Sequence, residues 1–204
     1  MFRTSSDKKD EKERVRAALL RAALRLGAAH GFASLGLREV AREAGIAPTS
    51  FYRHFADMQE LGLALSRELV GEVVSSVADT ARASDEPVAA AMWDALLQAC
   101  AADPELLRFF VAERVGASPS LRASLQGQLV KLAQELANAA ASEPLPPSAA
   151  NAAVVMLLDA CTRALEEPDE SSSALRESWL WIMGRLLAAP SRARPQHPAQ
   201  KSSR

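Results

Sequence analysis

Apolar residues recur every three to four positions along most of the chain, which is the period of an amphipathic α-helix. The first such run spans residues 11–30, with Val15 and Leu19 on its apolar side, and Gly31 ends it. A polar segment, residues 1–10, precedes this run and is predicted to be a flexible arm. The pattern predicts an all-α fold without a sheet.

Two short helices around a glycine turn are predicted between Leu37 and Phe55. Gly45 can adopt the positive φ that a helix end requires, and Pro48 suits the first position of the second helix because it has no amide proton. Phe51 and Phe55 are four residues apart, so they lie on one side of that helix and face inward. The pattern fits a helix-turn-helix, although periodicity alone is equally typical of an ordinary helical hairpin.

The other faces of the second short helix carry small hydroxyls, one tyrosine and basic side chains. Such a helix suits the major groove of DNA, with Thr49, Ser50 and Tyr52 toward base edges and with Arg53 and His54 nearer phosphates. The candidate DNA-contacting residues are Arg38, Pro48, Thr49, Ser50, Tyr52, Arg53 and His54.

Longer helices follow this motif. Residues 58–83 form one predicted helix that joins the amino-terminal part to the rest of the chain. Proline, serine and acidic residues punctuate the remainder and suit helix starts. The further predicted helices are residues 87–99, 104–111, 119–136, 149–165 and 173–189. Pro190 ends the last one and leaves a basic tail, residues 190–204, which we expect to be disordered.

Residues 32–63 read FASLGLREVAREAGIAPTSFYRHFADMQELGL. This run resembles the DNA-binding segment of the TetR family of bacterial repressors, in which a glycine turn precedes a Tyr-x-His-Phe ending. The segment REVAREAGIAPTSFYRHF, with ELGL after it, is similar to the corresponding segment of a narrower branch of the family, the desaturase repressors, which regulate unsaturated fatty acid synthesis and desaturation. Likeness to this branch extends in weaker form to the whole chain.

The resemblance implies a helix-turn-helix DNA-binding domain at residues 11–56 and a larger helical domain for ligand binding and dimerisation at residues 57–189. It implies a transcriptional repressor that binds a palindromic operator as a homodimer and responds to long-chain acyl-CoA. Tyr52 and His54 would contact phosphates. The sequence departs from the family pattern at Gly36, where hydroxyl residues are usual, and at Met58, where lysine is common.

Charge is unevenly distributed along the chain. Residues 1–56 hold 11 Lys and Arg against 6 Asp and Glu, whereas residues 57–204 hold 13 against 19. A basic amino-terminal part and an acidic remainder suit a protein that presents one end to a polyanion. A solvated charged helix is the alternative interpretation of this asymmetry.

Cys100 and Cys161 stand alone in apolar stretches without metal or redox spacing, so we expect buried reduced thiols. The amino terminus does not resemble a signal peptide. We also expect no apolar run of the eighteen or so residues that a membrane span needs, and we therefore predict a cytoplasmic protein that does not bind membranes.

The last two predicted helices are apolar around most of their circumference, and Trp181 is one of the apolar residues of the second. Such helices must be buried on more than one side. We expect a two-fold dimer in which they form a four-helix interface, with a monomeric core as the alternative. The candidate interface residues are Val154, Leu158, Cys161, Leu165, Leu175, Trp179, Ile182, Met183 and Leu186.

Residues from several helices of the larger domain could surround an elongated apolar cavity or could simply fill its core. The candidate ligand-binding residues are Met92, Trp93, Leu96, Phe109, Phe110, Leu129, Val155, Met156, Asp159 and Arg114. Asp159 is an acid within an apolar helix, where an unpaired carboxylate would be costly to bury. An ion pair with Arg163 is the alternative explanation for its presence there. The resemblance implies that the occupant is the acyl chain of a long-chain acyl-CoA, and Arg114 could meet the phosphates of the coenzyme.

No nucleophile elbow, phosphate-binding glycine loop, metal-spaced set or paired-carboxylate site is recognisable. We therefore predict no enzyme activity, no catalytic residue, no metal and no cofactor. Two alternatives remain: a repressor that responds to another hydrophobic molecule, such as a drug or a flavonoid, and an acyl-binding carrier or scaffold that never touches DNA. The basic amino-terminal part argues against the carrier.

Overall fold

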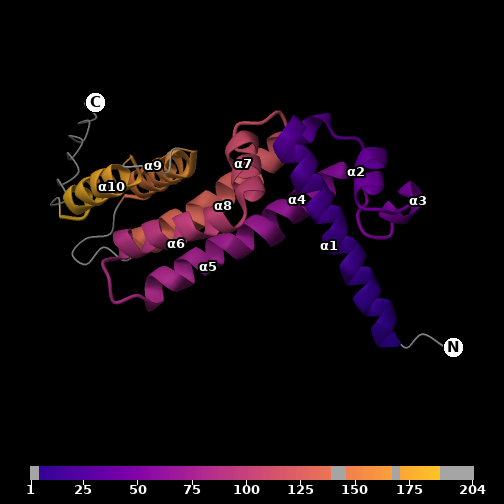
Figure 1. The fold of residues 1–204 in the computed structure, drawn as a ribbon, viewed down its shortest axis with the longest axis horizontal. Coiled ribbons are helices and arrows are strands. Elements are labelled where there is room, and N and C mark those ends of the chain that lie inside the picture. The colour runs from indigo at the N-terminus through magenta and orange to yellow at the C-terminus, as the bar shows by residue number, and fades with distance from the viewer. Residues whose placement is uncertain (1–4, 139–145, 167–170, 189–204) are drawn as a thin grey trace, which may run out of the picture.

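The computed structural model describes residues 5–138, 146–166 and 171–188, and every regular element in these ranges is helical. This confirms the all-α prediction. A small head at the amino-terminal end is joined by a long helical connector to a larger body (Figure 1). Residues 1–4 of the predicted arm and the predicted tail, 190–204, lie outside the described residues. Residues 5–10 were predicted to be flexible, but they extend the first helix instead.

The head contains α1 (Ser5–His30), a short 3-10 turn, η1 (Phe32–Ser34), and the helices α2 (Leu37–Glu43) and α3 (Pro48–Phe51). Gly31 has a φ of 81°, which lets the chain reverse between α1 and η1. The inward faces of all three helices meet in a small core of apolar side chains that includes Leu19, Val40 and Phe51.

The connector was predicted to be one continuous helix, whereas the structure divides it into three consecutive parts. These are α4 (Met58–Leu65), a π-helical turn, η2 (Ser66–Val70), and α5 (Gly71–Ala83). Asp57 caps α4 by accepting a hydrogen bond from the Glu60 amide at 2.8 Å, and the Glu60 carboxylate accepts one from the Ala56 amide at 2.6 Å. The spacing of Asp57 and Glu60 predicts a capping box, and the structure has its N-cap bond, whereas the Glu60 carboxylate bonds the amide of Ala56, one residue before the N-cap, instead of the Asp57 amide.

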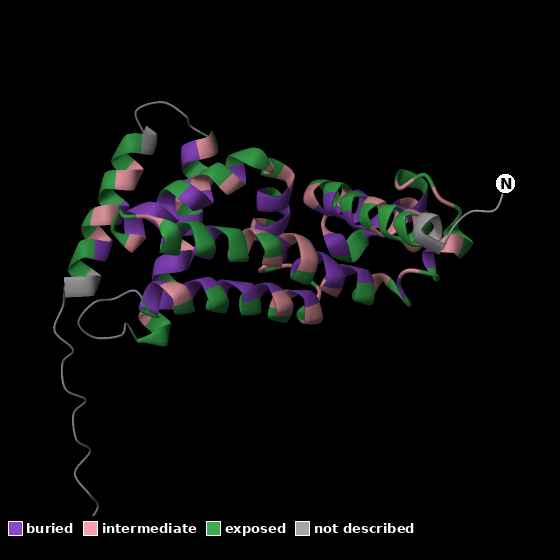
Figure 2. Ribbon diagram, turned by 90° about the horizontal axis from the view of Figure 1, so that it is seen from below, coloured by how far each residue is buried: buried purple, intermediate pink, exposed green. Residues whose placement is uncertain are grey.

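The body consists of α6 (Val88–Ala102), α7 (Pro104–Glu113), α8 (Pro119–Asn138), α9 (Pro147–Glu166) and α10 (Ser171–Ala188). Local sequence explains where they begin: Asp103 accepts a hydrogen bond from the Leu106 amide at 3.0 Å, and Pro104 occupies the first position of α7. Buried residues line the inward faces of these helices, while α9 and α10 lie at the end of the body away from the head (Figures 1 and 2).

Among the described helices, α9 is long and apolar enough to cross a membrane by length and composition alone. The expectation that no such run exists was therefore wrong. In the structure α9 packs against α6, α8 and α10. It buries Val154, Leu157 and Cys161 there, as the core helix of a folded body does.

Candidate nucleic-acid interface and ligand cavity

The turn between α2 and α3 has the geometry that the sequence predicted. Gly45 has a φ of 72°, and Pro48 is the first residue of α3. The second helix is shorter than expected, because α3 ends at Phe51 and the chain continues as turns up to His54. Those turns still place Phe51 and Phe55 inward, where their side chains are 0% and 1% exposed.

The opposite side of the α3 region faces solvent. Arg38, Pro48, Thr49 and Arg53 are exposed, and Tyr52 is 65% exposed although it is a large aromatic residue. Ser50 and His54 are half-buried at the margin of this face. The structure thus brings all seven candidate DNA-contacting residues to the two short helices and their turns, and Figure 1 shows α3 at the outer edge of the head.

His54 differs from the other candidates because its Nδ1 atom is buried without a hydrogen-bond partner. Burial lowers the pKa of this imidazole, and the nearby cations Lys12, Arg16 and Arg53 lower it further. His54 is therefore a neutral group near pH 7, and the positive charge beside it belongs to the surrounding cations. The sequence prediction had treated His54 as a possible cation.

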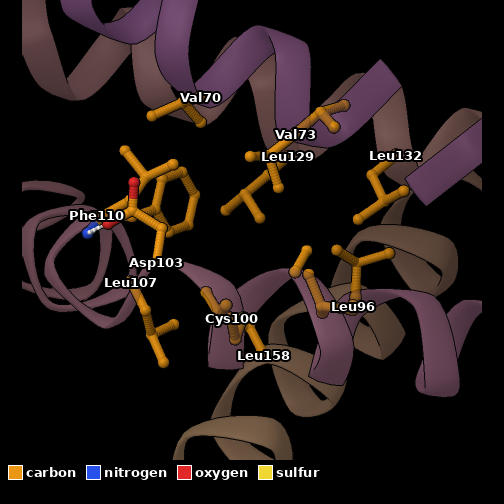
Figure 3. Close-up of a pocket in the computed structure, with 14 residues that line it drawn as sticks. Val70, Val73, Leu96, Cys100, Asp103, Leu107, Phe110, Leu129, Leu132 and Leu158 are labelled. Atoms are coloured by element: carbon orange, nitrogen blue, oxygen red, sulfur yellow. Dashed lines mark hydrogen bonds between the residues drawn. The ribbon is translucent and has the colours of Figure 1, made fainter. Parts of the chain in front are cut away.

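An apolar cavity lies where the connector crosses the body. Its volume is about 60 Å³, and side chains from the connector and from α6 to α9 point into it (Figure 3). The lining includes Val70, Val73, Val74, Leu96, Ala99, Cys100, Leu106, Leu107, Phe110, Leu129, Leu132, Val154 and Leu158. Asp103 also reaches it, but its carboxylate is engaged by Arg21 and by the Leu106 amide.

Three of the ten candidate ligand-binding residues, Leu96, Phe110 and Leu129, line this cavity. Met92 and Trp93 are buried elsewhere in the core. Phe109 is also fully buried, but its ring lies against Phe32 and the Gly27 backbone at the junction of head and body. These three residues pack in the core of this structure and do not line the cavity, which agrees with the alternative that the candidates fill the core.

The remaining ligand candidates also lie away from the cavity. Asp159 is exposed on α9 and forms an ion pair with Arg163 at 3.0 Å, as its alternative account predicted, because the acid falls on the solvent side of the helix. Met156 is 44% exposed and Val155 is half-buried. Arg114 ends α7 with its Nε atom buried and unpaired.

Sequence reasoning missed the connector residues Val70, Val73 and Val74, as well as Cys100 and Leu132. The sequence predicts residues 58–83 only as a helix that joins the amino-terminal part to the rest of the chain. The π-helical turn shifts which connector residues face α6 and α8, and nothing in the sequence signals that shift.

Several predicted dimer-interface residues are already covered within one chain. Val154, Cys161, Trp179 and Met183 are at most 2% exposed, and Leu158 lines the cavity. These residues cannot form the contact surface with a partner unless the body opens, so their assignment is corrected. Val154, Leu158 and Cys161 are buried because α9 packs against α6 and α8 as well as against α10, whereas Trp179 and Met183 lie on α10, which packs against α9 and α6.

Other apolar side chains on α8, α9 and α10 remain accessible. The half-buried candidates are Leu165, Leu175 and Ile182. Three further apolar residues, which were not interface candidates, are exposed: Val130, Met156 and Trp181. The Trp181 side chain is 65% exposed, and the Arg185 guanidinium lies over its ring. The side chain of Leu186 lies outside the described residues.

Comparison with known proteins agrees with this geometry. Residues 19–65 match the family described as bacterial regulatory proteins, tetR family. A TetR family transcription regulator from Marinobacter aquaeolei VT8 has a similar fold, with a TM-score of 0.68 and 20% identity over 84% of this chain and 96% of that one.

Two further solved structures with known ligands share the fold. FadR from Bacillus subtilis, in complex with stearoyl-CoA, has a TM-score of 0.67 and 15% identity over 86% of this chain and 99% of that one. The multidrug binding protein EbrR, complexed with imidazole, has a TM-score of 0.62 and 22% identity over 87% and 92%. The matched segment, 19–65, contains α2, the glycine turn and α3, so this part of the chain is similar to the tetR family of bacterial regulatory proteins, and the fold of the described residues is similar to that of a solved TetR family regulator.

Proposed function

We propose that this chain is a cytoplasmic repressor of fatty acid desaturation and unsaturated fatty acid genes, which binds a palindromic operator as a homodimer and is modulated by long-chain acyl-CoA. One observation carries the effector part: an apolar cavity shares its wall with the connector that carries the DNA-binding head. A molecule that enters there pushes against Val70, Val73 and Val74, and therefore against the element on which the head is mounted.

The lining of the cavity selects for hydrocarbon. All but one of its residues are apolar, and the exception, Asp103, already has polar partners. A polar or charged ligand group would lose its hydration there without gaining a hydrogen bond. The stearoyl-CoA bound by FadR from Bacillus subtilis shows that a protein of this fold can hold such a chain.

The cavity must enlarge to admit an acyl chain. Its volume is about 60 Å³, whereas ligand pockets usually measure roughly 300–1,000 Å³. Burial of an alkyl chain contributes about 0.8 kcal/mol per methylene, hence roughly 11 kcal/mol for a palmitoyl chain, which is enough to offset a substantial rearrangement. Ligand binding and movement of the connector are thus the same event, and the ligand acts through its higher affinity for the opened body.

The dimer is proposed to form through the accessible apolar residues of α9 and α10, chiefly Met156 and Trp181. One short recognition helix contacts few bases, so specific binding requires two half-sites about 34 Å apart. We expect Trp181→Glu to convert the dimer to a monomer in light scattering coupled to size-exclusion chromatography. Val115→Glu, at an exposed apolar residue on the turn between α7 and α8, is the matched control and should leave the dimer intact. A dimer that tolerates Trp181→Glu would contradict this interface.

The whole proposal is tested by fluorescence anisotropy with a labelled duplex that has first been selected from random sequences by the protein itself. We expect tight binding to an inverted repeat, a steep loss of affinity between 50 and 200 mM salt as phosphate contacts are screened, and a change in affinity on addition of palmitoyl-CoA or oleoyl-CoA. Selection of no sequence would contradict the repressor assignment. Operator binding that ignores both thioesters would contradict the effector assignment only.

A different hydrophobic effector is the second candidate. The same apolar lining would accept a flat aromatic drug, and EbrR is a multidrug binding protein of this fold. Loss of operator binding with aromatic compounds, together with no response to acyl thioesters, would favour this alternative.

A further inference from the structure

Arg16 of α1 makes three contacts that converge on the carboxyl end of the recognition segment and on the connector. Its guanidinium lies over the Phe55 ring, 4.4 Å from the ring centroid, and its Nη1 atom donates to the His54 carbonyl at 3.4 Å. Its Nη2 atom forms an ion pair with the carboxylate of Glu68 in the connector. Arg16 therefore fixes the end of the DNA-reading segment and the connector to the same side chain.

Glu68 lies in the π-helical turn η2, and that turn is also the start of the cavity wall. Val70, two residues after Glu68, is one of the lining residues. Ser66, two residues before it, is fully buried and accepts a hydrogen bond from the Ser124 hydroxyl of α8 at 2.8 Å. Within five residues, η2 thus contacts the body, the cavity and the head.

We propose that Arg16 and Glu68 are positioning residues for DNA recognition, which transmit the state of the cavity to the recognition segment through the π-helical turn. This inference rests on the proposed function, because it requires that an occupant of the cavity changes operator affinity. It adds a specific path: displacement of Val70 turns η2, Glu68 moves with it, and Arg16 carries the movement to His54 and Phe55.

The π-helical geometry makes such a movement feasible. An α-helix advances 100° and 1.5 Å per residue, and a π turn holds one residue more than an α turn. Conversion of η2 toward α-helical pairing would therefore rotate Glu68 relative to α5 without unfolding the connector. The side chains of Arg16 and Glu68 are 26% and 39% exposed, so solvent screens their attraction incompletely. A movement of Glu68 therefore changes the position of Arg16.

The test compares two ion pairs of the head. Glu68→Gln removes the pair between head and connector. Glu43→Gln removes the pair between Arg25 and Glu43, which has a length of 3.0 Å, joins α1 to α2 and does not touch the connector. For each protein, operator affinity is measured by anisotropy with and without saturating palmitoyl-CoA, and palmitoyl-CoA affinity is measured in the absence of DNA.

A substitution in the cavity makes the test independent of the identity of the ligand. Val73→Phe places a larger side chain at a half-buried lining position and so mimics an occupant. The effect of Val73→Phe on operator affinity is measured in the wild-type background and in the Glu68→Gln background, which gives a double-mutant cycle. Thermal unfolding of every variant shows whether each is folded.

The proposal predicts that saturating palmitoyl-CoA changes the operator Kd of the wild-type protein by a factor of about 5–150, the usual range for coupled sites. Glu68→Gln should reduce this factor to less than about twofold. Its affinity for palmitoyl-CoA without DNA should stay within about threefold of the wild-type value. Glu43→Gln should keep the full factor. Glu68→Gln that keeps the full response to palmitoyl-CoA or to Val73→Phe would overturn the proposal. If palmitoyl-CoA does not change the operator affinity of the wild-type protein, the effector assignment has failed. The Val73→Phe cycle then tests the coupling by itself: a change in operator affinity that Glu68→Gln abolishes supports the proposal, and one that Glu68→Gln leaves intact overturns it.

Discussion

Phe32 and Phe109 meet edge to face, with ring centroids 6.2 Å apart and ring planes at 85°, and this contact joins the head to the body. Glycines allow the two rings to pack so closely. A Cβ atom on Gly27 would lie 2.9 Å from the Phe109 ring, and one on Gly62 would lie 2.7 Å from the Phe32 ring. The orientation of the head thus depends on the absence of side chains at two helical positions.

We predict that Gly62→Ala destabilises the protein although alanine favours a helix. The gain in helix propensity is about 1 kcal/mol, whereas overpacking against a buried ring costs about 1–3 kcal/mol. Gly127 offers the matched control, because it is an exposed position within α8 whose added Cβ meets nothing within 4 Å. Urea unfolding should show that Gly127→Ala raises and Gly62→Ala lowers the free energy of unfolding. Stabilisation by both substitutions would contradict the packing described at Phe32.

Glu113 provides the polar part of the same junction. It is 3% exposed, and its Oε1 atom accepts a hydrogen bond from the Phe32 amide at 2.7 Å. Glu113→Ala leaves that buried amide without a partner, so we expect a loss of about 1–3 kcal/mol in the free energy of unfolding. Glu113→Gln retains the acceptor and should lose less. Equal losses in denaturant unfolding for the two variants would show that this hydrogen bond contributes nothing.

His54 should make the protein sensitive to mild acid. Because its pKa is lowered in the folded chain, chiefly by burial, the unfolded chain binds the proton first as pH falls through about 6.5. The folded state therefore loses stability below that pH, while above it both states carry a neutral imidazole. Free energies of unfolding at pH 7.5 and 5.5 should differ more for the wild-type protein than for His54→Gln. The same pH dependence in both would refute this account.

The two thiols should be unreactive in the folded protein. Burial raises the pKa of Cys100 to about 11 and raises that of Cys161 still further, so neither forms a thiolate at pH 8. We expect negligible reaction with a thiol-specific disulfide reagent until denaturant unfolds the body, after which two thiols react. Occupation of the cavity should slow the reaction of Cys100 further, because its side chain lines the cavity. Rapid modification of the native protein would contradict the described burial.

Much of the head could be predicted from local sequence. Gly45, Pro48 and the pair Phe51 and Phe55 determine a turn and two faces by short-range geometry alone, and the structure confirms their arrangement. The length of α3 could not be predicted in the same way. Its last turn is replaced by other hydrogen bonds that depend on contacts with α1.

The cavity was harder to predict, because the periodicity of an apolar helix does not show which neighbour covers each face. Val154 and Leu158 were assigned to a dimer interface, yet they line a cavity within one chain. Asp159 was assigned to the ligand, yet it lies one helix face away in solvent. Both errors arise from long-range packing: α9 is covered on two sides by its own body, which a single sequence does not specify.

In the proposed mechanism, the apolar cavity and the operator-binding face are coupled. The most direct measurement is the affinity of palmitoyl-CoA for the free protein and for the protein bound to its operator. Because coupling is reciprocal, the account predicts that these two affinities differ at least about fivefold, by the same factor by which the thioester changes operator affinity. Equal affinities for the free and the operator-bound protein would contradict it.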